Sequence, residues 1–314
     1  MKSRGTRSLP TPEEWTASAD RDWRIRLRPD CGTRRRHMQE LPSNDHSGGA
    51  VADSVIAGKT ALVTGASSGL GVDFARELAS RGCRLVVVAR REDRLKQLQQ
   101  ELKAAHGTDV TVVTLDLSQP EAPRALHDLL QQQKIEVDIL VNNAGFGLFG
   151  RDVDLPPRRS AEMLQLDVVA LTQLTQLFAR DMVRRGDGHI LQVASTGAFQ
   201  PSPSYAAYGA AKAYVLNYGH ALNFELRGSG VSCSVICPGV TATEFLDVSG
   251  QQRNWFHNAT MMSSTAVAQA GIRAMLARRY LVVPGWFNAL SAFFTRLTPR
   301  PVLAWLAARL MRNP

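Results

Sequence analysis

The pattern of apolar and polar positions alternates between short apolar runs and longer stretches with helical spacing. Several of the short runs are apolar at consecutive positions, which is typical of strands buried on both faces of a parallel sheet. The predicted strands are "KTALV" (59–63), "RLVVVA" (84–89), "VTVVTL" (110–115), "VDILV" (137–141), "HILQVA" (189–194), "VSCSVI" (231–236) and "YLVVP" (280–284).

Stretches with helical spacing fill the intervals between these runs. They cover residues 69–80, 91–105, 121–133, 158–184, 205–227 and 263–278. Because strand and helix alternate strictly, the sequence predicts an α/β fold with a doubly wound parallel sheet of about seven strands. Right-handed crossovers then place helices on both faces of that sheet.

Charge is distributed unevenly along the 314 residues, which hold 37 Lys and Arg against 28 Asp and Glu. Residues 1–37 contain ten basic and five acidic side chains, so we interpret residues 1–50 as a basic, disordered leader and linker. Two alternatives stay open: translation from Met38, and a nucleic-acid-binding arm. The "GTRRRH" run has no interleaved aromatic residues, which argues against nucleic acid as a partner.

The four cysteines are Cys31, Cys83, Cys233 and Cys237. Cys233 and Cys237 lie four apart within an apolar strand, so we interpret them as small core residues rather than a metal or redox pair. No CxxC pair or neighbouring histidine occurs. We therefore expect no metal site and a reducing, cytoplasmic location.

Three glycines follow the first predicted strand in "TGASSGLG" and precede a predicted helix. In a dinucleotide-binding turn, such glycines permit a tight turn and bring the backbone close to a pyrophosphate at the helix N-terminus. The spacing of Gly65, Gly69 and Gly71 is GxxxGxG, so this turn alone is weak evidence for a bound dinucleotide.

The second predicted strand ends in Ala89, Arg90 and Arg91. An NAD site usually carries an acidic residue here, which accepts hydrogen bonds from the ribose hydroxyls. Arginine cannot accept such a bond, but its planar guanidinium suits a 2′-phosphate. The sequence therefore favours NADP(H) over NAD(H), with a solvated helix start as the alternative reading of these arginines.

From Lys59 to Thr243 the chain resembles the classical short-chain dehydrogenases/reductases, which have a Rossmann-like fold. Five motifs in family order carry this resemblance. They are TGxxxGxG (64–71), "LDL" (115–117), "NNAG" (142–145), Ser195 with YxxxK thirteen residues later (208–212), and PGxxxT (238–243).

The resemblance implies a cofactor site built from all five motifs. It assigns the adenine end to Asp116 and Leu117, and the nicotinamide cover to the PGxxxT motif. The cofactor residues are Gly65, Ser67, Ser68, Gly69, Leu70, Gly71, Arg90, Asp116, Leu117, Asn143, Ala144, Gly145, Tyr208, Lys212, Pro238, Gly239, Val240, Thr241 and Thr243.

The resemblance also implies catalytic roles for Ser195, Tyr208 and Lys212. Lys212 follows Tyr208 by one helical turn, so its ammonium lies on the same face and is expected to lower the phenol pKa from about 10 in water. Tyr208 is then the general acid/base for a carbonyl oxygen, and Ser195 stabilises charge on that oxygen. Lys212 also holds the nicotinamide ribose.

Asp167 departs from the family pattern. The family usually has an asparagine 28 residues before the active serine, where it holds a water in a proton relay. An ionised aspartate only accepts hydrogen bonds. Its charge is expected to raise the pKa values of Lys212 and Tyr208, opposing the activation by lysine. We expect an altered but working relay, with Asp167 among the catalytic residues.

Two segments lie outside the motifs. We expect residues 244–262 to form a mobile substrate lid, in which Phe245, Leu246, Trp255, Phe256, Met261 and Met262 cover an apolar pocket or pack on the core. Residues 285–314 form a helical extension with Trp286, Leu290, Phe293, Phe294, Leu297, Val302, Trp305, Leu306 and Leu310 at helical spacing. This extension fills the core, forms a dimer contact or lies on a membrane surface.

Residues 51–284 are thus expected to form the catalytic domain of an NADP(H)-dependent oxidoreductase. It interconverts a carbonyl group (ketone, aldehyde or 3-oxoacyl) and an alcohol, on a small apolar substrate. We expect a homodimer or homotetramer with peripheral membrane contact through the C-terminal helices. The alternative is an NADP(H)-binding sensor or scaffold with weak or no turnover, which Asp167 favours.

Overall fold

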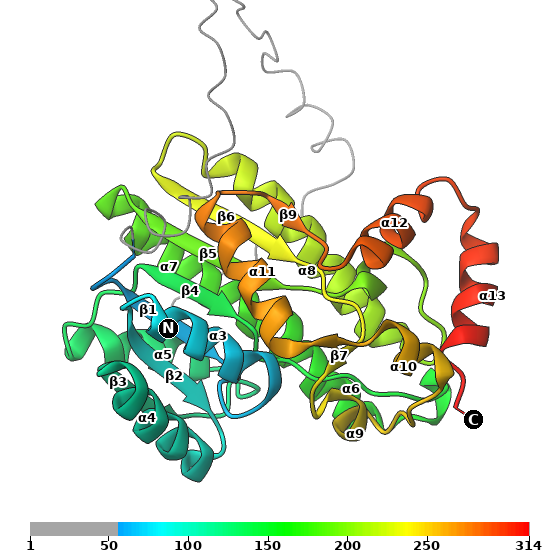
Figure 1. Cartoon of the computed structure of the whole chain (residues 1–314), viewed down its shortest axis with the longest axis horizontal. Coiled ribbons are helices and arrows are strands. Elements are labelled where there is room, and N and C mark those ends of the chain that lie inside the picture. The colour runs from blue at the N-terminus through cyan, green and yellow to red at the C-terminus, as the bar shows by residue number, and fades with distance from the viewer. Residues whose placement is uncertain (1–55, 314) are drawn as a thin grey trace, which may run out of the picture. The chain divides into compact units, whose positions relative to one another are not determined.

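A computed structural model describes residues 56–313 of the chain. Its centre is a seven-stranded, all-parallel sheet in the order β3-β2-β1-β4-β5-β6-β9 (Figure 1). The strands are β1 (Thr60–Thr64), β2 (Arg84–Ala89), β3 (Val110–Thr114), β4 (Ile139–Asn142), β5 (Gly188–Val193), β6 (Val231–Ile236) and β9 (Leu281–Val282). The predicted α/β fold is confirmed.

Helices cover both faces of this sheet. The helices of the described residues, including those of the lid and the C-terminal extension, are α3 (Gly69–Ser80), α4 (Glu92–His106), α5 (Ala122–Gln132), α6 (Pro157–Leu164), α7 (Leu171–Arg185), α8 (Ala206–Glu225), α9 (Phe245–Ser249), α10 (Trp255–Thr260), α11 (Ser264–Leu276), α12 (Trp286–Phe294) and α13 (Arg300–Leu310). Short 3₁₀ turns lie at η1 (Asp152–Asp154) and η3 (Thr196–Phe199), and a π-helical turn at η2 (Gln165–Ala170).

Two apolar layers hold the helices to the sheet. On one face α3, α4 and α11 bury Phe74, Leu95 and Ile272 against the strands, and Figure 1 shows α3 and α11 side by side. On the other face α5 and α7 bury Leu126 and Phe178, and α8 packs on β5 and β6. The strands are apolar at consecutive positions because both of their faces are covered.

The prediction of a single helix over residues 158–184 is wrong. Helix α6 ends at Leu164, and η2 separates it from α7. A π-helical turn leaves the regular i→i−4 hydrogen bonding, and it frequently marks a functional site. Here it carries Asp167, whose carboxylate accepts the backbone N–H of Phe146 at 3.0 Å. The local deformation therefore occurs at the residue that departs from the family pattern.

The lid and the last strand also differ from the prediction. Residues 244–262 contain α9 and α10, and a small parallel sheet of β7 (Thr241–Ala242) and β8 (Met262–Ser263) closes the segment. Strand β9 pairs only at Leu281 and Val282. The leader, Met38 and Cys31 lie outside the described residues, so the division of the chain at residue 50 stays a prediction.

Candidate active site

A cleft of about 440 Å³ lies at the carboxyl ends of the central strands. Parallel α/β sheets bind ligands at this edge, where the strand order reverses. All but two of the predicted site residues line this cleft. The exceptions are Gly71 and Asp167, which are buried behind it.

The turn after β1 lies unusually close to the neighbouring backbone. Gly65 and Gly69 have φ values of 68° and 55°, which favour glycine. A Cβ atom on Gly65 would lie 2.9 Å from Ala144 Cα, and one on Gly71 would lie 2.2 Å from the carbonyl oxygen of Gly65. Ser68 begins α3 without a side-chain cap, so the first N–H groups of the helix are available to an anion.

Thr64 and Asn143 hold this turn against the loop after β4. Thr64 Oγ1 accepts the backbone N–H groups of Asn143 and Ala144, each at 3.0 Å, and Asn143 Nδ2 donates to the Thr64 carbonyl oxygen at 2.9 Å. The glycine positions and these bonds leave a cradle with space for a pyrophosphate, and this fits the dinucleotide that the sequence predicts.

Substitution of Gly71 by alanine is expected to destabilise the fold by about 3 kcal/mol, because the new methyl group would overlap a backbone oxygen. Gly197→Ala is the matched control, since its nearest contacts, at 3.4 Å, are ordinary; its cost is expected to stay within about 0.5 kcal/mol. Urea unfolding measures both variants. Equal stability of the two would contradict the close packing of the turn.

Arg90 and Arg91 both line the cleft at the end of β2. Arg91 Nε donates to Ser67 Oγ at 3.2 Å, and its Nη1 lies 3.1 Å from Glu244 Oε2. Arg90 is exposed, and its charge acts on Asp116. Partial burial works to raise the Asp116 pKa, but hydrogen bonds from Ser118 and the charge of Arg90 outweigh it and lower the pKa. Arg91 was not among the predicted cofactor residues. Its contacts with Ser67 and Glu244 hold it at the same end of the cleft as Arg90.

Ser195, Tyr208 and Lys212 meet beside this cofactor cleft. Ser195 follows β5 and begins η3, where its Oγ accepts the N–H of Gly197 at 3.1 Å. The Tyr208 hydroxyl forms a side-chain hydrogen bond with Ser195. Lys212 lies one turn further along α8, with its Nζ 5.5 Å from the centre of the Tyr208 ring and 3.2 Å from the Val193 carbonyl oxygen. The three predicted catalytic side chains therefore lie together in the structure.

Asp167 is fully buried beneath the cleft. Its Oδ2 lies 3.0 Å from Lys212 Nζ and makes no aligned hydrogen bond within residues 56–313. A Cβ atom on Gly145 would lie 2.8 Å from this oxygen, so the carboxylate packs directly under the "NNAG" loop. Burial raises the Asp167 pKa, and the charge of Lys212 offsets this only in part. The carboxylate thus replaces the expected amide with a direct ion pair to the lysine.

The expectation that Lys212 lowers the pKa of Tyr208 is wrong for this structure. Burial raises the Tyr208 pKa above its usual value, and the charge of Asp167 raises it further, whereas the hydrogen bond with Ser195 opposes the shift. The Lys212 ammonium is paired with the Asp167 carboxylate, whose negative charge opposes a stabilisation of the phenolate by the lysine. The Tyr208 hydroxyl is therefore held in its protonated form at neutral pH.

Aromatic side chains surround the Tyr208 ring on the lid side. Phe245 lies 5.3 Å from Tyr208 between ring centres, and Tyr205 lies 5.5 Å from it. The Tyr205 hydroxyl donates to Gln251 Oε1 at 2.9 Å and pairs with Ser249 Oγ at 2.8 Å, which fixes the segment after α9. The substrate side of the cleft is therefore largely apolar.

The predicted lid residues divide into different environments. Phe245 and Leu246 line the cleft, Met262 packs on the core, and Trp255 is 70% exposed. Two further residues that were not predicted also line the cleft: Ala307 of α13, and Met311 directly after this helix. Gln251 Nε2 donates to the Met311 carbonyl oxygen at 2.7 Å and links the two segments.

No group of His, Cys, Asp or Glu side chains within residues 56–313 is arranged to hold a metal ion. Cys83, Cys233 and Cys237 are buried free thiols, and the prediction that Cys233 and Cys237 are core residues is confirmed. Burial raises the pKa of Cys233 to about 12, so its thiol is unreactive at neutral pH.

Comparison with known proteins agrees with this geometry. A ketoacyl reductase of Nostoc is 33% identical over 59% of this chain and 64% of its own length. A short-chain dehydrogenase from Sphingobium yanoikuyae, solved with NADPH, is 31% identical, with a TM-score of 0.68 over 76% of this chain and 94% of its own. A short-chain dehydrogenase/reductase from Burkholderia phymatum, solved with NAD, is 27% identical, with a TM-score of 0.69 over 76% and 93% of the two chains.

The alignment to the first curated relatives covers 61% and 75% of their lengths. The sequence profile of the short chain dehydrogenases matches residues 59–254. These residues hold six of the seven strands of the sheet, β1 to β6, together with the glycine turn, Asp167 and the group formed by Ser195, Tyr208 and Lys212. The chain therefore belongs to the short-chain dehydrogenase/reductase family of oxidoreductases.

Proposed function

We propose that this protein is an NADP(H)-dependent oxidoreductase that interconverts a ketone, aldehyde or 3-oxoacyl group and the corresponding alcohol. The observation that carries the proposal is the convergence of Ser195, Tyr208 and Lys212 on one cleft with the dinucleotide cradle. The nicotinamide supplies or accepts the hydride when it is bound. The reductases and dehydrogenases among the relatives support this class of reaction, but they do not identify the substrate.

The side chains of the cleft account for the proton chemistry. The Tyr208 hydroxyl gives its proton to the carbonyl oxygen during reduction, and Ser195 donates a hydrogen bond to that oxygen as charge develops on it. Lys212 and Asp167 lie near the phenol as a charged pair, and the charge of Asp167 raises the Tyr208 pKa. A phenol with a raised pKa is protonated at neutral pH, which is the form that carbonyl reduction requires.

The aromatic and aliphatic lining next to Tyr208 supports an apolar substrate. This surface is formed by Phe245, Leu246 and Val248 of the lid, by Ala307 of α13, and by Met311 directly after that helix. The proposal is tested by following NADPH oxidation with long-chain and aromatic ketones, aldehydes and 3-oxoacyl thioesters. Turnover of at least one of these carbonyls supports it, and binding of NADPH without turnover of any would overturn it.

Preference for NADP(H) over NAD(H) follows from the two arginines at the end of β2. The double variant Arg90→Ala/Arg91→Ala is expected to bind NADPH about ten- to a hundredfold more weakly, because charge-assisted bonds to the 2′-phosphate are lost. Its affinity for NADH is expected to stay the same. Calorimetric titration with each dinucleotide measures both.

Arg94→Ala is the matched control for this selectivity test. Arg94 also pairs with Glu244, at 2.5 Å, but it does not line the cleft. NADPH affinity should therefore survive its replacement. Equal losses of NADPH and NADH affinity in the double variant would show that the arginines only support the fold.

A second candidate function is an NADP(H)-binding sensor or scaffold with weak turnover. The ion pair between Asp167 and Lys212 favours it, because that pair leaves the phenol without an activating charge. Under this candidate, NADPH binds but no carbonyl is reduced at any pH. The same substrate panel, run across a pH series, separates the two functions.

We further propose a homodimer or homotetramer in the cytoplasm. Leu164, Val169 and Tyr214, on the face formed by α6, η2 and α8, are each about two-fifths exposed and offer an apolar contact. The free thiols fit a reducing compartment. Within residues 56–313 no helix is long and apolar enough to cross a membrane. Analytical ultracentrifugation measures the oligomeric state.

A further inference from the structure

Acidic and basic residues are segregated along the described chain. Residues 56–247 hold 19 Lys and Arg against 20 Asp and Glu, and are nearly neutral in sum. Residues 248–313 hold eight arginines and no Asp or Glu. Arg296, Arg300, Arg309 and Arg312 of this group lie on or beside α12 and α13. The end of the molecule that these helices form is therefore positively charged.

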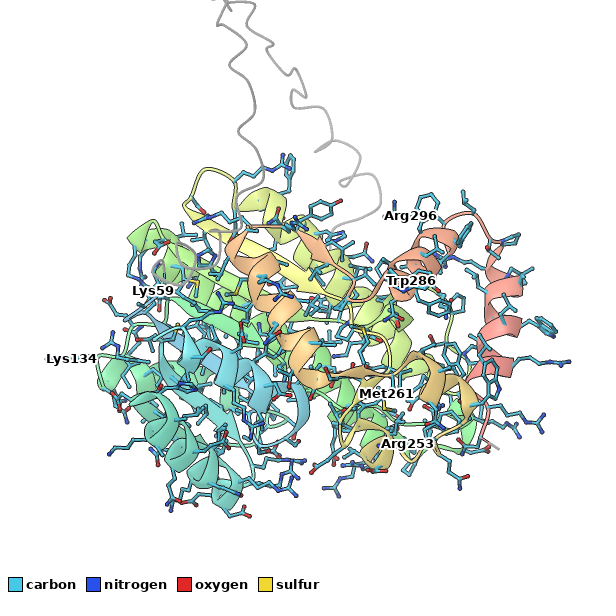
Figure 2. All side chains as sticks on the ribbon, in the orientation of Figure 1. Lys59, Lys134, Arg253, Met261, Trp286 and Arg296 are labelled. Atoms are coloured by element: carbon cyan, nitrogen blue, oxygen red, sulfur yellow. The ribbon has the colours of Figure 1, made fainter. Side chains whose placement is uncertain are left out.

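The same two helices and the segment that joins them expose a large apolar surface. Trp286 is 80% exposed, Leu297 68% and Trp305 57%. The exposed residues recur at spacings of three and four, so each helix presents one continuous apolar stripe. These residues, hereafter the C-terminal apolar surface, are Trp286, Phe287, Leu290, Phe293, Phe294, Leu297, Val302, Trp305 and Leu306. Figure 2 shows Trp286 and Arg296 at this end of the molecule, away from β3 and α4.

We propose that the C-terminal apolar surface binds the headgroup region of an anionic lipid bilayer. Tryptophan and arginine together are typical of helices that lie in a membrane interface, where the rings reach the acyl boundary and the guanidinium groups meet lipid phosphates. The Arg309 guanidinium lies 5.0 Å from the centre of the Trp305 ring, so charge and ring are presented together. The surrounding segment has no carboxylate to repel an anionic surface.

The other two interpretations of the extension fit the structure less well. Core filling accounts only for the inner residues Ala292, Leu303 and Ala307, which are buried, and leaves the stripes in solvent. A symmetric contact between two copies of this surface would bring arginines of both chains together without any acidic partner from the same segment. Lipid phosphates supply the missing negative charge.

Helix α13 lies between this surface and the cleft. Ala307 and Met311 line the cleft, whereas Trp305 and Leu306 on the same helix are exposed. A bilayer bound to the C-terminal apolar surface is therefore one helix away from the substrate pocket. If the proposed reductase function holds, an apolar carbonyl compound dissolved in the membrane is the substrate class that this arrangement serves.

Vesicle co-sedimentation of the full chain tests lipid binding without relying on activity. Vesicles of phosphatidylcholine and phosphatidylglycerol in equal parts are compared with phosphatidylcholine alone, at low and high salt, because salt screens the contribution of exposed charges. The variant Trp286→Ser/Phe293→Ser/Trp305→Ser is expected to bind the mixed vesicles at least about tenfold more weakly, because it removes three large apolar side chains that the bilayer would cover. Arg296→Gln/Arg300→Gln/Arg309→Gln should lose the preference for anionic lipid.

The matched control is Phe224→Ser/Tyr280→Ser, which replaces aromatic side chains that are 64% and 59% exposed outside this surface. It should bind as the unmodified chain does, and unfolding midpoints check that all variants fold. Binding of the triple serine variant at the unmodified level would overturn the proposal and assign the binding elsewhere, such as to the basic N-terminal residues. A shift to smaller oligomers in that variant, without any vesicle binding by the unmodified chain, would show a contact between copies.

Discussion

Replacement of Tyr208 by phenylalanine is expected to lower kcat for carbonyl reduction by about 10²–10⁴-fold, the usual contribution of a positioned general acid. The hydroxyl of Tyr208 is the group paired with Ser195, and the substitution removes its oxygen alone. The ring contacts with Tyr205 and Phe245 remain available to phenylalanine, so folding and NADPH affinity should be retained. Steady-state kinetics and NADPH titration on the same preparation measure both quantities.

Tyr214→Phe is the matched control for this loss. Tyr214 lies on the same helix, is 40% exposed, and pairs with Thr172 outside the cleft. Its kinetics should match those of the unmodified enzyme. Wild-type turnover by Tyr208→Phe would remove Tyr208 from the reaction and would require another proton donor in the cleft.

Replacement of Asp167 by asparagine is expected to shift the pH dependence of both reaction directions by about one unit toward lower pH. The Asp167 charge raises the Tyr208 pKa and pairs with the Lys212 ammonium. Its removal frees that positive charge to favour the phenolate. Alcohol oxidation needs the phenolate and rises with pH through the Tyr208 pKa, so the variant should oxidise alcohols faster at neutral pH.

The alkaline limb of carbonyl reduction should move in the same direction. Reduction needs the protonated phenol and falls as pH rises through its pKa, so a lower pKa brings that fall closer to neutrality. The matched control is Asp181→Asn, which alters a buried carboxylate paired with His127 and Arg184 far from the cleft. It should leave the pH profiles unchanged. Equal or lower oxidation by Asp167→Asn, with unchanged profiles, would contradict the role of the carboxylate.

The sheet was predictable because its strands are buried on both faces and therefore apolar at consecutive positions. The bounds of β2 and β6 agree with the prediction, and all seven predicted strands occur. The division of the 158–184 helix was not predictable from periodicity, because a π-helical turn keeps the apolar spacing nearly helical. Its cause is tertiary: the Asp167 carboxylate lies between the Phe146 N–H and the Lys212 ammonium.

The short helices of the lid were missed for a different reason. Helix α10 has six residues, too few for a periodic pattern, and its signal is the cap alone: Asn254 accepts the N–H of His257, and the His257 ring accepts the N–H of Asn254. Local caps of this kind are visible in a sequence only when the motif is searched for.

Most of the candidate site was predictable because the motifs fix residues at the ends of consecutive strands. The contacts between side chains from distant parts of the sequence were not predictable. Arg91 is held by Ser67 and by Glu244, which is 153 residues away in sequence. Ala307 and Met311 reach the cleft because α13 packs near the lid, which no local pattern indicates. The direct contact of Asp167 with Lys212 likewise depends on how η2 packs against α8.

The most direct test of the account is transfer of deuterium from NADPH labelled at the reactive nicotinamide carbon to an apolar carbonyl substrate. Deuterium is expected on the alcohol carbon of the product with the unmodified chain, detected by mass spectrometry. Tyr208→Phe should give at least about a hundredfold less labelled alcohol in the same time, although both proteins bind NADPH. Tight NADPH binding by the unmodified chain with no labelled alcohol from any ketone, aldehyde or 3-oxoacyl thioester would contradict the reductase and favour the sensor.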